Sequence, residues 1–225
     1  MPVPPDATAA PASPADRWGV VVPVKRLALA KSRLAAHGDA QRAALALAFA
    51  ADVVASALAC PGVQRVLVVT DDPTATEVLT ALGASVVGDL PDAGLDAALV
   101  HGAAVLRSRD PALSVVALSA DLPAARPQDL RAVLDAVPVA GRAFLPDAAG
   151  SGTTLLAARA PAELHPAYGT GSRARHLASG AVELDGAPGL RRDVDTPVDL
   201  AEALVLGVGP RTAAVAAQLP AAEGP

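Results

Sequence analysis

The chain has 225 residues, of which 52% are hydrophobic, 2% aromatic and 18% charged. This length and apolar content predict one α/β domain whose core is mostly aliphatic. The net charge of -5 at pH 7 argues against a broad nucleic-acid surface, because phosphate-backbone binding needs Lys and Arg clustered over a wide face.

The cysteine content and the two ends of the chain suggest a compartment and domain limits. Cys60 is the sole cysteine, which excludes an intrachain disulfide or a cysteine–zinc cluster and favours a reducing cytoplasm; it is interpreted as a small packed residue. Residues 1–16 lack the regions of a signal peptide and are predicted to be a disordered tail. We expect a domain over residues 17–209, a fraying C-terminal tail over 210–225, and no membrane helix, because no apolar run reaches roughly 20 residues.

The first predicted strand leads into a cationic loop. Residues 18–24 are nearly continuously apolar, which predicts a central strand. Four cations follow within nine residues: Lys25, Arg26, Lys31 and Arg33. The chain's two lysines both lie here, and a compact charge with rotatable donors suits phosphate oxygens. A solvated loop is the alternative, but the position after the carboxyl end of a strand favours phosphate binding.

The next segments alternate between helical and strand patterns. Helices are predicted over about residues 39–59, from residue 73, and over about 94–107; strands are predicted over 64–72 and 83–88. This order implies right-handed crossovers and a mixed, mostly parallel sheet with helices on both faces, which is a Rossmann-like α/β fold.

Polar residues in this region have local interpretations. Asp71 or Asp72 is predicted to cap the helix that begins at residue 73. Gly94 precedes a helix start whose free amides favour an anion or a polar base edge, although a glycine before a helix is common. His101, on that helix, is interpreted as a surface or packed histidine.

An apolar run too short for a helix ends in a carboxylate at Asp121. Residues 115–118 predict a buried parallel strand with Asp121 at its carboxyl end, the edge where ligands bind in open α/β sheets. Asp121 could instead cap a helix predicted over about residues 127–136. Since Asp129 lies closer to that start, we favour a functional carboxylate.

Two glycine-rich segments follow. The first, residues 150–154, lies after a strand predicted over 142–147 and forms either an anion-binding backbone nest or a hairpin turn. In the second, residues 168–173, free amides with Ser172 and Arg173 could face one phosphate, or Ser172 could cap the short helix that follows.

The last informative segment holds paired aspartates. Thr196, Pro197 and Asp199 account for a helix start. They leave Asp193 and Asp195 unexplained, and residues two apart in an extended segment project to the same side. A cationic loop, backbone anion sites and separated carboxylates suit phosphates plus Mg²⁺, which takes one or two carboxylates together with substrate phosphates. Asp121 and Asp193 would suffice.

Five segments, in this order and spacing, resemble the 2-phospho-L-lactate and phosphoenolpyruvate guanylyltransferases of coenzyme F420 biosynthesis, within the MobA-like nucleotidyltransferase superfamily. They are VPVK at 22–25 with AKSRL at 30–34, GLDAA at 94–98, ADLP at 120–123, GTT at 152–154 and DVDTP at 193–197. The resemblance implies a nucleotide-diphospho-sugar transferase-like fold. It also implies transfer of GMP from GTP to a phosphorylated acid, for which we expect phosphoenolpyruvate, with release of pyrophosphate.

The resemblance implies roles for individual residues. Asp121 and Asp193 match the magnesium ligands. The same two aspartates and Lys31 match the catalytic residues. The residues assigned to the nucleotide are Lys25, Lys31, Arg33, Gly94 and Asp96. The residues assigned to the acid are Thr153, Gly169 and Ser172. The implied partners are GTP, phosphoenolpyruvate and the next enzyme of the F420 pathway, which would receive the product.

Within the resembled family, 2-phospho-L-lactate stays open as the acceptor, because both acids present a carboxylate and a phosphate on a three-carbon frame. Two further alternatives remain. A related nucleotidyltransferase would use a molybdopterin or sugar phosphate acceptor. A nucleotide-sensing or scaffold protein with a degenerate site would bind GTP without releasing pyrophosphate, but the retained lysines and aspartates argue against it.

Overall fold

The computed structural model describes residues 17–29 and 38–219. The predicted tail over residues 1–16 and the loop positions Lys31 and Arg33 lie outside the described residues.

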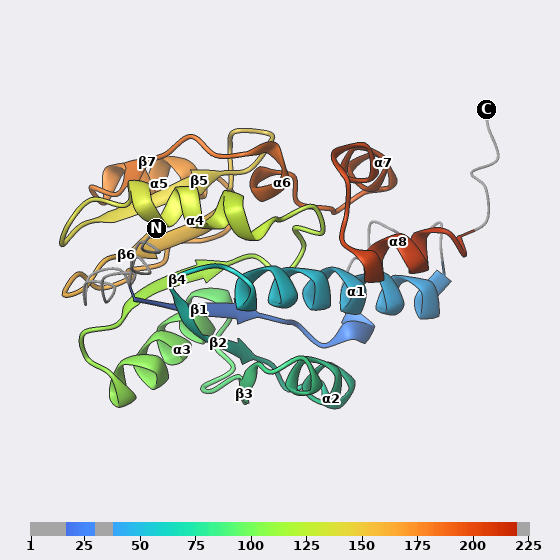
Figure 1. Cartoon of the computed structure of the whole chain (residues 1–225), viewed down its shortest axis with the longest axis horizontal. Helices are drawn as coiled ribbons and strands as arrows, with labels where there is room; N and C mark the ends of the chain where they lie inside the picture. The colour runs from blue at the N-terminus through green and yellow to red at the C-terminus, as the bar shows by residue number, and fades with distance from the viewer. Residues whose placement is uncertain (1–16, 30–37, 220–225) are drawn as a thin grey trace, which may run out of the picture.

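A seven-stranded sheet forms the centre of the described fold (Figure 1). Its strands are β1 (Trp18–Pro23), β2 (Val63–Val69), β3 (Ser85–Val87), β4 (Ser114–Leu118), β5 (Arg142–Pro146), β6 (Thr153–Ala158) and β7 (Val182–Glu183). Their order is β3-β2-β1-β4-β6-β5-β7. The β6 strand runs antiparallel to both neighbours, whereas the other neighbouring pairs are parallel. The predicted mixed, mostly parallel sheet is confirmed.

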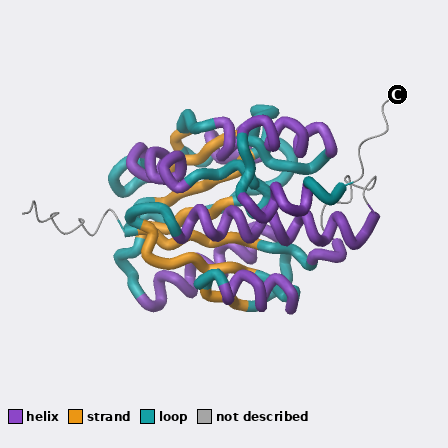
Figure 2. The backbone as a smooth tube through the Cα atoms, turned by 45° about the vertical axis from the view of Figure 1, so that its right-hand side comes forward, coloured by secondary structure: helices purple, strands orange, loops and turns teal. Residues whose placement is uncertain are grey.

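Helices flank the sheet on both sides (Figure 2). They are α1 (Gly38–Leu58), α2 (Pro73–Ala81), α3 (Leu95–Arg109), α4 (Pro127–Ala136), α5 (Ser172–Ala178), α6 (Pro188–Arg191), α7 (Pro197–Leu206) and α8 (Pro210–Ala216), with a 3-10 turn η2 (Leu27–Leu29). The predicted cap of α2 is Asp72, whose Oδ1 accepts from the Ala75 amide at 3.0 Å.

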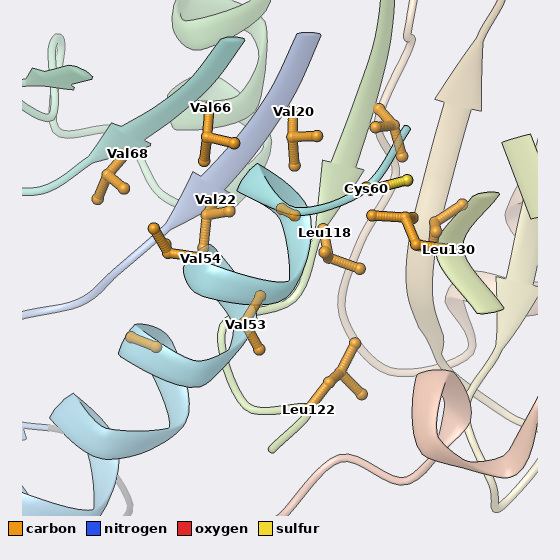
Figure 3. Packing of buried hydrophobic residues seen from close by; sticks show 14 of the residues in the cluster. Val20, Val22, Val53, Val54, Cys60, Val66, Val68, Leu118, Leu122 and Leu130 are labelled. Carbon is orange, nitrogen blue, oxygen red and sulfur yellow. The ribbon is translucent and has the colours of Figure 1, made fainter. Parts of the chain in front are cut away.

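Alternate residues of the central strand pack on opposite faces. Val20 and Val22 lie in a buried cluster with α1 residues such as Val53 (Figure 3), whereas Val21 packs against α3. The approach of α3 is close enough to require Gly102, because a Cβ there would lie 2.6 Å from Val21 Cγ1. These two apolar layers explain why the central strands are apolar throughout.

Cys60 packs in the α1-side cluster (Figure 3). Burial raises the pKa of its thiol to about 11, with a smaller effect from Asp135, while Arg131 acts in the opposite direction. The thiol is therefore protonated at neutral pH, as expected of a packing residue.

The α1 helix bears on the expectation that no apolar run is long enough to span a membrane. By length and composition alone it could cross one, yet 61% of its most apolar window is buried inside the fold. Asp39, Arg42 and Asp52 interrupt its apolar sequence, so α1 is not an uninterrupted apolar run of that length. Its apolar residues cover one face of the sheet, so its composition is that of a core helix.

The prediction of a fraying tail from residue 210 is wrong for its first part. Residues 210–216 form α8, which packs on α1. The buried Asp52 carboxylate accepts from the Thr212 amide at 2.8 Å and from the Arg211 amide at 3.2 Å. A Cβ at Gly209 would lie 2.3 Å from Asp52 Cγ. An Ala-rich segment is thus held by a helix cap about 160 residues earlier in the chain.

The strand order places a topological switch between β1 and β4. From β1 the chain builds β2 and β3 on one side, and it then returns to add β4 on the other side of β1. In open α/β sheets the crevice at the carboxyl ends of two such strands is where ligands bind.

Candidate active site

A cavity of about 660 Å³ opens at the switch point. Pro23 and Lys25 from the end of β1 line it, together with the β4 end from Ala117 to Asp121. Leu95 and Leu99 of α3 add an apolar wall. The cavity therefore brings the cationic loop start and the strand-end carboxylate to one place.

The acidic side of this site comes from two distant segments. The Val194 amide donates to the Asp121 carbonyl at 3.0 Å, which joins the exit of β4 to the segment before α7. Asp195 lines the cavity, as Asp121 does. The same two segments also approach closely at Gly189 of α6. A Cβ there would lie 2.2 Å from the Ala124 carbonyl oxygen, so this position requires glycine.

Asp193 is the most perturbed carboxyl group of this segment. Burial raises its pKa to about 6, and the negative charges of Asp121, Asp195 and Asp147 add to the increase. Asp193 is therefore close enough to Asp121 for their charges to interact. Like-charged carboxylates in a partly buried site are stabilised by a cation.

The donor chemistry fits a hard divalent cation. Asp121 and Asp193 offer only oxygen ligands, which Mg²⁺ prefers. Within the described ranges, no group of three or more His, Cys, Asp or Glu side chains could hold a metal ion. Two carboxylates leave coordination positions for water and substrate phosphates, which is the usual Mg²⁺ arrangement.

A loop before α5 forms another wall of the cavity, through Tyr168 and Gly169. Behind it, Ser172 Oγ lies 3.0 Å from Thr153 Oγ1, which in turn lies 2.9 Å from His176 Nδ1. His176 Nε2 accepts from the Ala167 amide at 3.0 Å. This buried network connects the first residue of β6 with α5 and with the loop.

Comparison with known proteins decides the family. A family model described as "Guanylyl transferase CofC like" matches residues 18–219. A Streptomyces coelicolor protein named phosphoenolpyruvate guanylyltransferase is 61% identical over 206 residues, covering 90% of this chain and 97% of that protein. A relative of the same name from Thermomonospora curvata is 56% identical, covering 91% and 90% of the two chains. The chain belongs to the CofC-like guanylyl transferase family.

Solved structures show the same fold at low sequence identity. A Desulfovibrio desulfuricans protein named for the nucleotide-diphospho-sugar transferases superposes with a TM-score of 0.60 and 17% identity, over 81% of this chain and 84% of that one. A 4-diphosphocytidyl-2C-methyl-D-erythritol synthase gives 0.57 and 14%, over 84% and 98%. The predicted nucleotide-diphospho-sugar transferase-like fold is confirmed, and this CofC-like chain is a nucleotidyltransferase.

The residues that were assigned to the nucleotide are only partly gathered at the cavity. Lys25 lines it, whereas Lys31 and Arg33 lie outside the described residues. Gly94 is the N-cap of α3, with φ of 92° and no side-chain cap. Asp96 Oδ1 accepts from the Tyr168 amide at 2.9 Å, so this carboxylate ties α3 to the loop before α5.

Both glycine-rich segments differ in part from prediction. In the first, the amides of Ser151 and Gly152 donate to the Asp147 carboxylate at 2.9 and 2.8 Å, within the hairpin between β5 and β6. The hairpin alternative therefore holds, and these amides are not free for an anion. The side chain of Asp147 itself occupies the nest.

In the second segment, the suggested cap is wrong and Arg173 is held away from Ser172, whereas contact of Ser172 with a phosphorylated ligand stays a prediction. The N-cap of α5 is Gly171, without a side-chain bond, and the Ser172 hydroxyl contacts Thr153 instead. Arg173 forms an ion pair with Glu183, through bonds of 2.8 and 3.0 Å. The Arg173 guanidinium thus binds an acid on β7, and this contact could not be predicted from the local sequence.

His176 is a residue that the sequence analysis missed. Its position four residues after Ser172 places both on one face of a helix, which was the available signal. It is buried against Phe144 and Tyr168, with ring centroids at 5.6 and 5.4 Å. Burial lowers its pKa below 6.5, and Arg175 and Arg142 lower it further, against the opposite effect of Asp96.

Proposed function

We propose that this protein transfers GMP from GTP to phosphoenolpyruvate, giving enolpyruvyl-diphospho-5'-guanosine and pyrophosphate, as a cytoplasmic step of coenzyme F420 biosynthesis. The observation that carries the choice of substrate is the 61% identity, over nearly the whole length of both chains, to a protein named phosphoenolpyruvate guanylyltransferase. A cavity at the switch point with Lys25 and Asp121 at its wall supports the proposal.

The chemistry needs alignment more than proton transfer. A phosphate oxygen of the acceptor attacks the α-phosphorus of GTP, a new P–O bond forms, and the bond to the β-phosphate breaks so that its electron pair leaves with pyrophosphate. A phosphomonoester has a second pKa of about 6 and is already an anion at neutral pH, so a general base is not required. The main barrier is repulsion between two polyanions.

The proposed roles divide the site into three parts. Lys25, with Lys31 and Arg33, neutralises the GTP phosphates. Gly94 and Asp96 contribute to nucleotide binding. The hydroxyls of Thr153 and Ser172 and the backbone of Gly169 hold the phosphorylated acid. Asp121 and Asp193 would hold Mg²⁺, which when bound supplies charge neutralisation between the two substrates.

The decisive experiment is a substrate matrix. Pyrophosphate release is measured from GTP, ATP, CTP and UTP, each with phosphoenolpyruvate, 2-phospho-L-lactate, a molybdopterin and a sugar phosphate. We expect the combination of GTP and phosphoenolpyruvate to release pyrophosphate at a rate well above that of every other combination. Preference for 2-phospho-L-lactate would change the acceptor, whereas activity only with molybdopterin or sugar phosphate would overturn the proposal. Under the proposed function, the next enzyme of the F420 pathway is a partner of this protein and receives its product.

A further inference from the structure

The loop of residues 167–171, here called the acceptor loop, is held from outside by one guanidinium. Arg175 donates to the carbonyls of Ala167 at 3.1 Å, Tyr168 at 2.8 Å and Thr170 at 2.6 Å. In a trans peptide the C=O and the following N–H point in opposite directions. The amide after Ala167 obeys this rule, since Tyr168 N donates to Asp96 on α3.

The same geometry orients the glycine amide of the loop. Because the Tyr168 carbonyl faces Arg175, the Gly169 amide faces the opposite side, where α3 and the cavity lie. Gly169 has φ of 104°, a conformation that other residues rarely adopt. The Gly169 amide can therefore donate to a ligand in the cavity only while the carbonyls of the acceptor loop face Arg175.

The hydrogen-bond directions behind the loop are fixed by His176. Its Nε2 accepts from the Ala167 amide, so the proton of the neutral ring lies on Nδ1 and is donated to Thr153 Oγ1. The hydroxyls of Thr153 and Ser172 share one further bond, which uses one of their two hydrogens. Ser172 is the donor of this bond, so among the described residues the Thr153 hydroxyl hydrogen is left, and it suits an acceptor such as a phosphate or carboxylate oxygen.

We propose that His176 is a positioning residue for the phosphorylated acid, holding the Thr153–Ser172 hydroxyl pair through Nδ1 and the acceptor loop through Nε2. This inference rests on the proposed function, because it concerns the acceptor half of that site. His176 is fully buried and, like Thr153 and Ser172, does not line the cavity, whereas Tyr168 and Gly169 of the acceptor loop do, so His176 acts through its neighbours. The lowered pKa keeps the ring neutral, as acceptance at Nε2 requires.

Two variants separate the two bonds, because Asn overlays Nδ1 and Gln overlays Nε2. His176→Asn retains a donor to Thr153 and loses the acceptor for the Ala167 amide, whereas His176→Gln does the reverse. His176→Phe removes both bonds while filling the space against Phe144 and Tyr168. His165→Asn, an exposed change just before the loop at a backbone conformation that Asn tolerates, is the matched control.

Wild-type enzyme is first assayed with the substrate matrix, and KM values are then measured with the acceptor it uses. We expect KM for the acceptor to rise about tenfold in His176→Asn and His176→Gln and further in His176→Phe, with KM for GTP unchanged and the control like wild type, since about one hydrogen bond is lost at each step. Folded variants with an unchanged KM for the acceptor would overturn the inference. Equal increases in both KM values would indicate a purely structural role and also overturn it.

A substrate-free readout separates this inference from the proposed function. NMR of the imidazole nitrogens should show His176 as the Nδ1–H tautomer, staying neutral below pH 6.5. An Nε2–H tautomer would overturn the inference even if the enzyme uses phosphoenolpyruvate. Conversely, absence of activity with phosphoenolpyruvate would overturn the proposed function, while the tautomer and the acceptor identified in the matrix would still test His176.

Discussion

The roles of single residues in this site depend on segments that meet only in the fold. Asp121 follows a strand, and Asp193 follows a short helix about 70 residues later, yet the charge of one raises the pKa of the other. This coupling is the electrostatic reason for assigning both to one cation. The metal role itself is a prediction, which substitution of Asp121 tests.

Asp121→Asn should lower kcat on the order of 100-fold or more at saturating Mg²⁺, because a bound cation supplies several kcal/mol of transition-state stabilisation and each 1.36 kcal/mol is tenfold. Stability should change little, since the substitution removes a negative charge from an acidic cluster. Steady-state kinetics and urea unfolding measure the two effects, with exposed Asp185→Asn as the control. Near-normal turnover of Asp121→Asn would refute the metal role.

A second prediction at the residue scale concerns His176 and pH. Its folded pKa lies below the unfolded value of 6.5, so the unfolded chain binds more protons and stability rises with pH through this window. The contribution is fully present above pH 6.5 and is lost as the pH falls through the folded pKa. Urea unfolding from pH 7.5 to 5 should show a shallower decline for His176→Phe than for wild type; identical slopes would contradict the prediction.

At the scale of elements, sequence reasoning succeeded where the signal is local. Apolar runs indicated the strands, and Asp72 and Thr196 marked helix starts, because period and caps are properties of a few neighbouring residues. The strand-end position of Asp121 followed from the same pattern. What was missed depends on contacts between distant segments: the Asp52 cap of α8, the Arg173–Glu183 pair and the network of His176.

The cap of α8 gives a prediction at this scale. Asp52→Ala removes a buried carboxylate that accepts two amides, so we expect a loss of about 1.5–3 kcal/mol in the free energy of unfolding. Arg211→Ala removes only a half-exposed ion-pair partner and should cost under about 1 kcal/mol. Urea unfolding gives both values, and hydrogen exchange should show faster exchange in α8 only for Asp52→Ala. Equal costs would indicate that the amide bonds are not the main contribution.

At the scale of the whole molecule, the acidic segment is supported by a third apolar cluster. Val194, between the two aspartates, is buried with Leu45 and Phe49 of α1 and with residues of α7. Val215 of α8 and Leu219 pack against the same cluster, and Phe49 also lines the cavity. The C-terminal helix therefore supports the site indirectly, through the core beneath Asp193 and Asp195.

Removal of residues 209–225 should accordingly affect both stability and catalysis. It removes Val215 and Leu219 from the cluster that contains Phe49 and Leu45, and full burial of a large apolar side chain contributes about 1.5–3 kcal/mol, so the urea midpoint should fall clearly. Because Val194 loses part of its packing, kcat should fall more than in Asp52→Ala, which keeps these apolar residues in the chain. Removal of residues 220–225, which lie beyond the described part, is the control and should resemble wild type. A 209–225 deletion with wild-type midpoint and kcat would show that the acidic segment holds its position without α8.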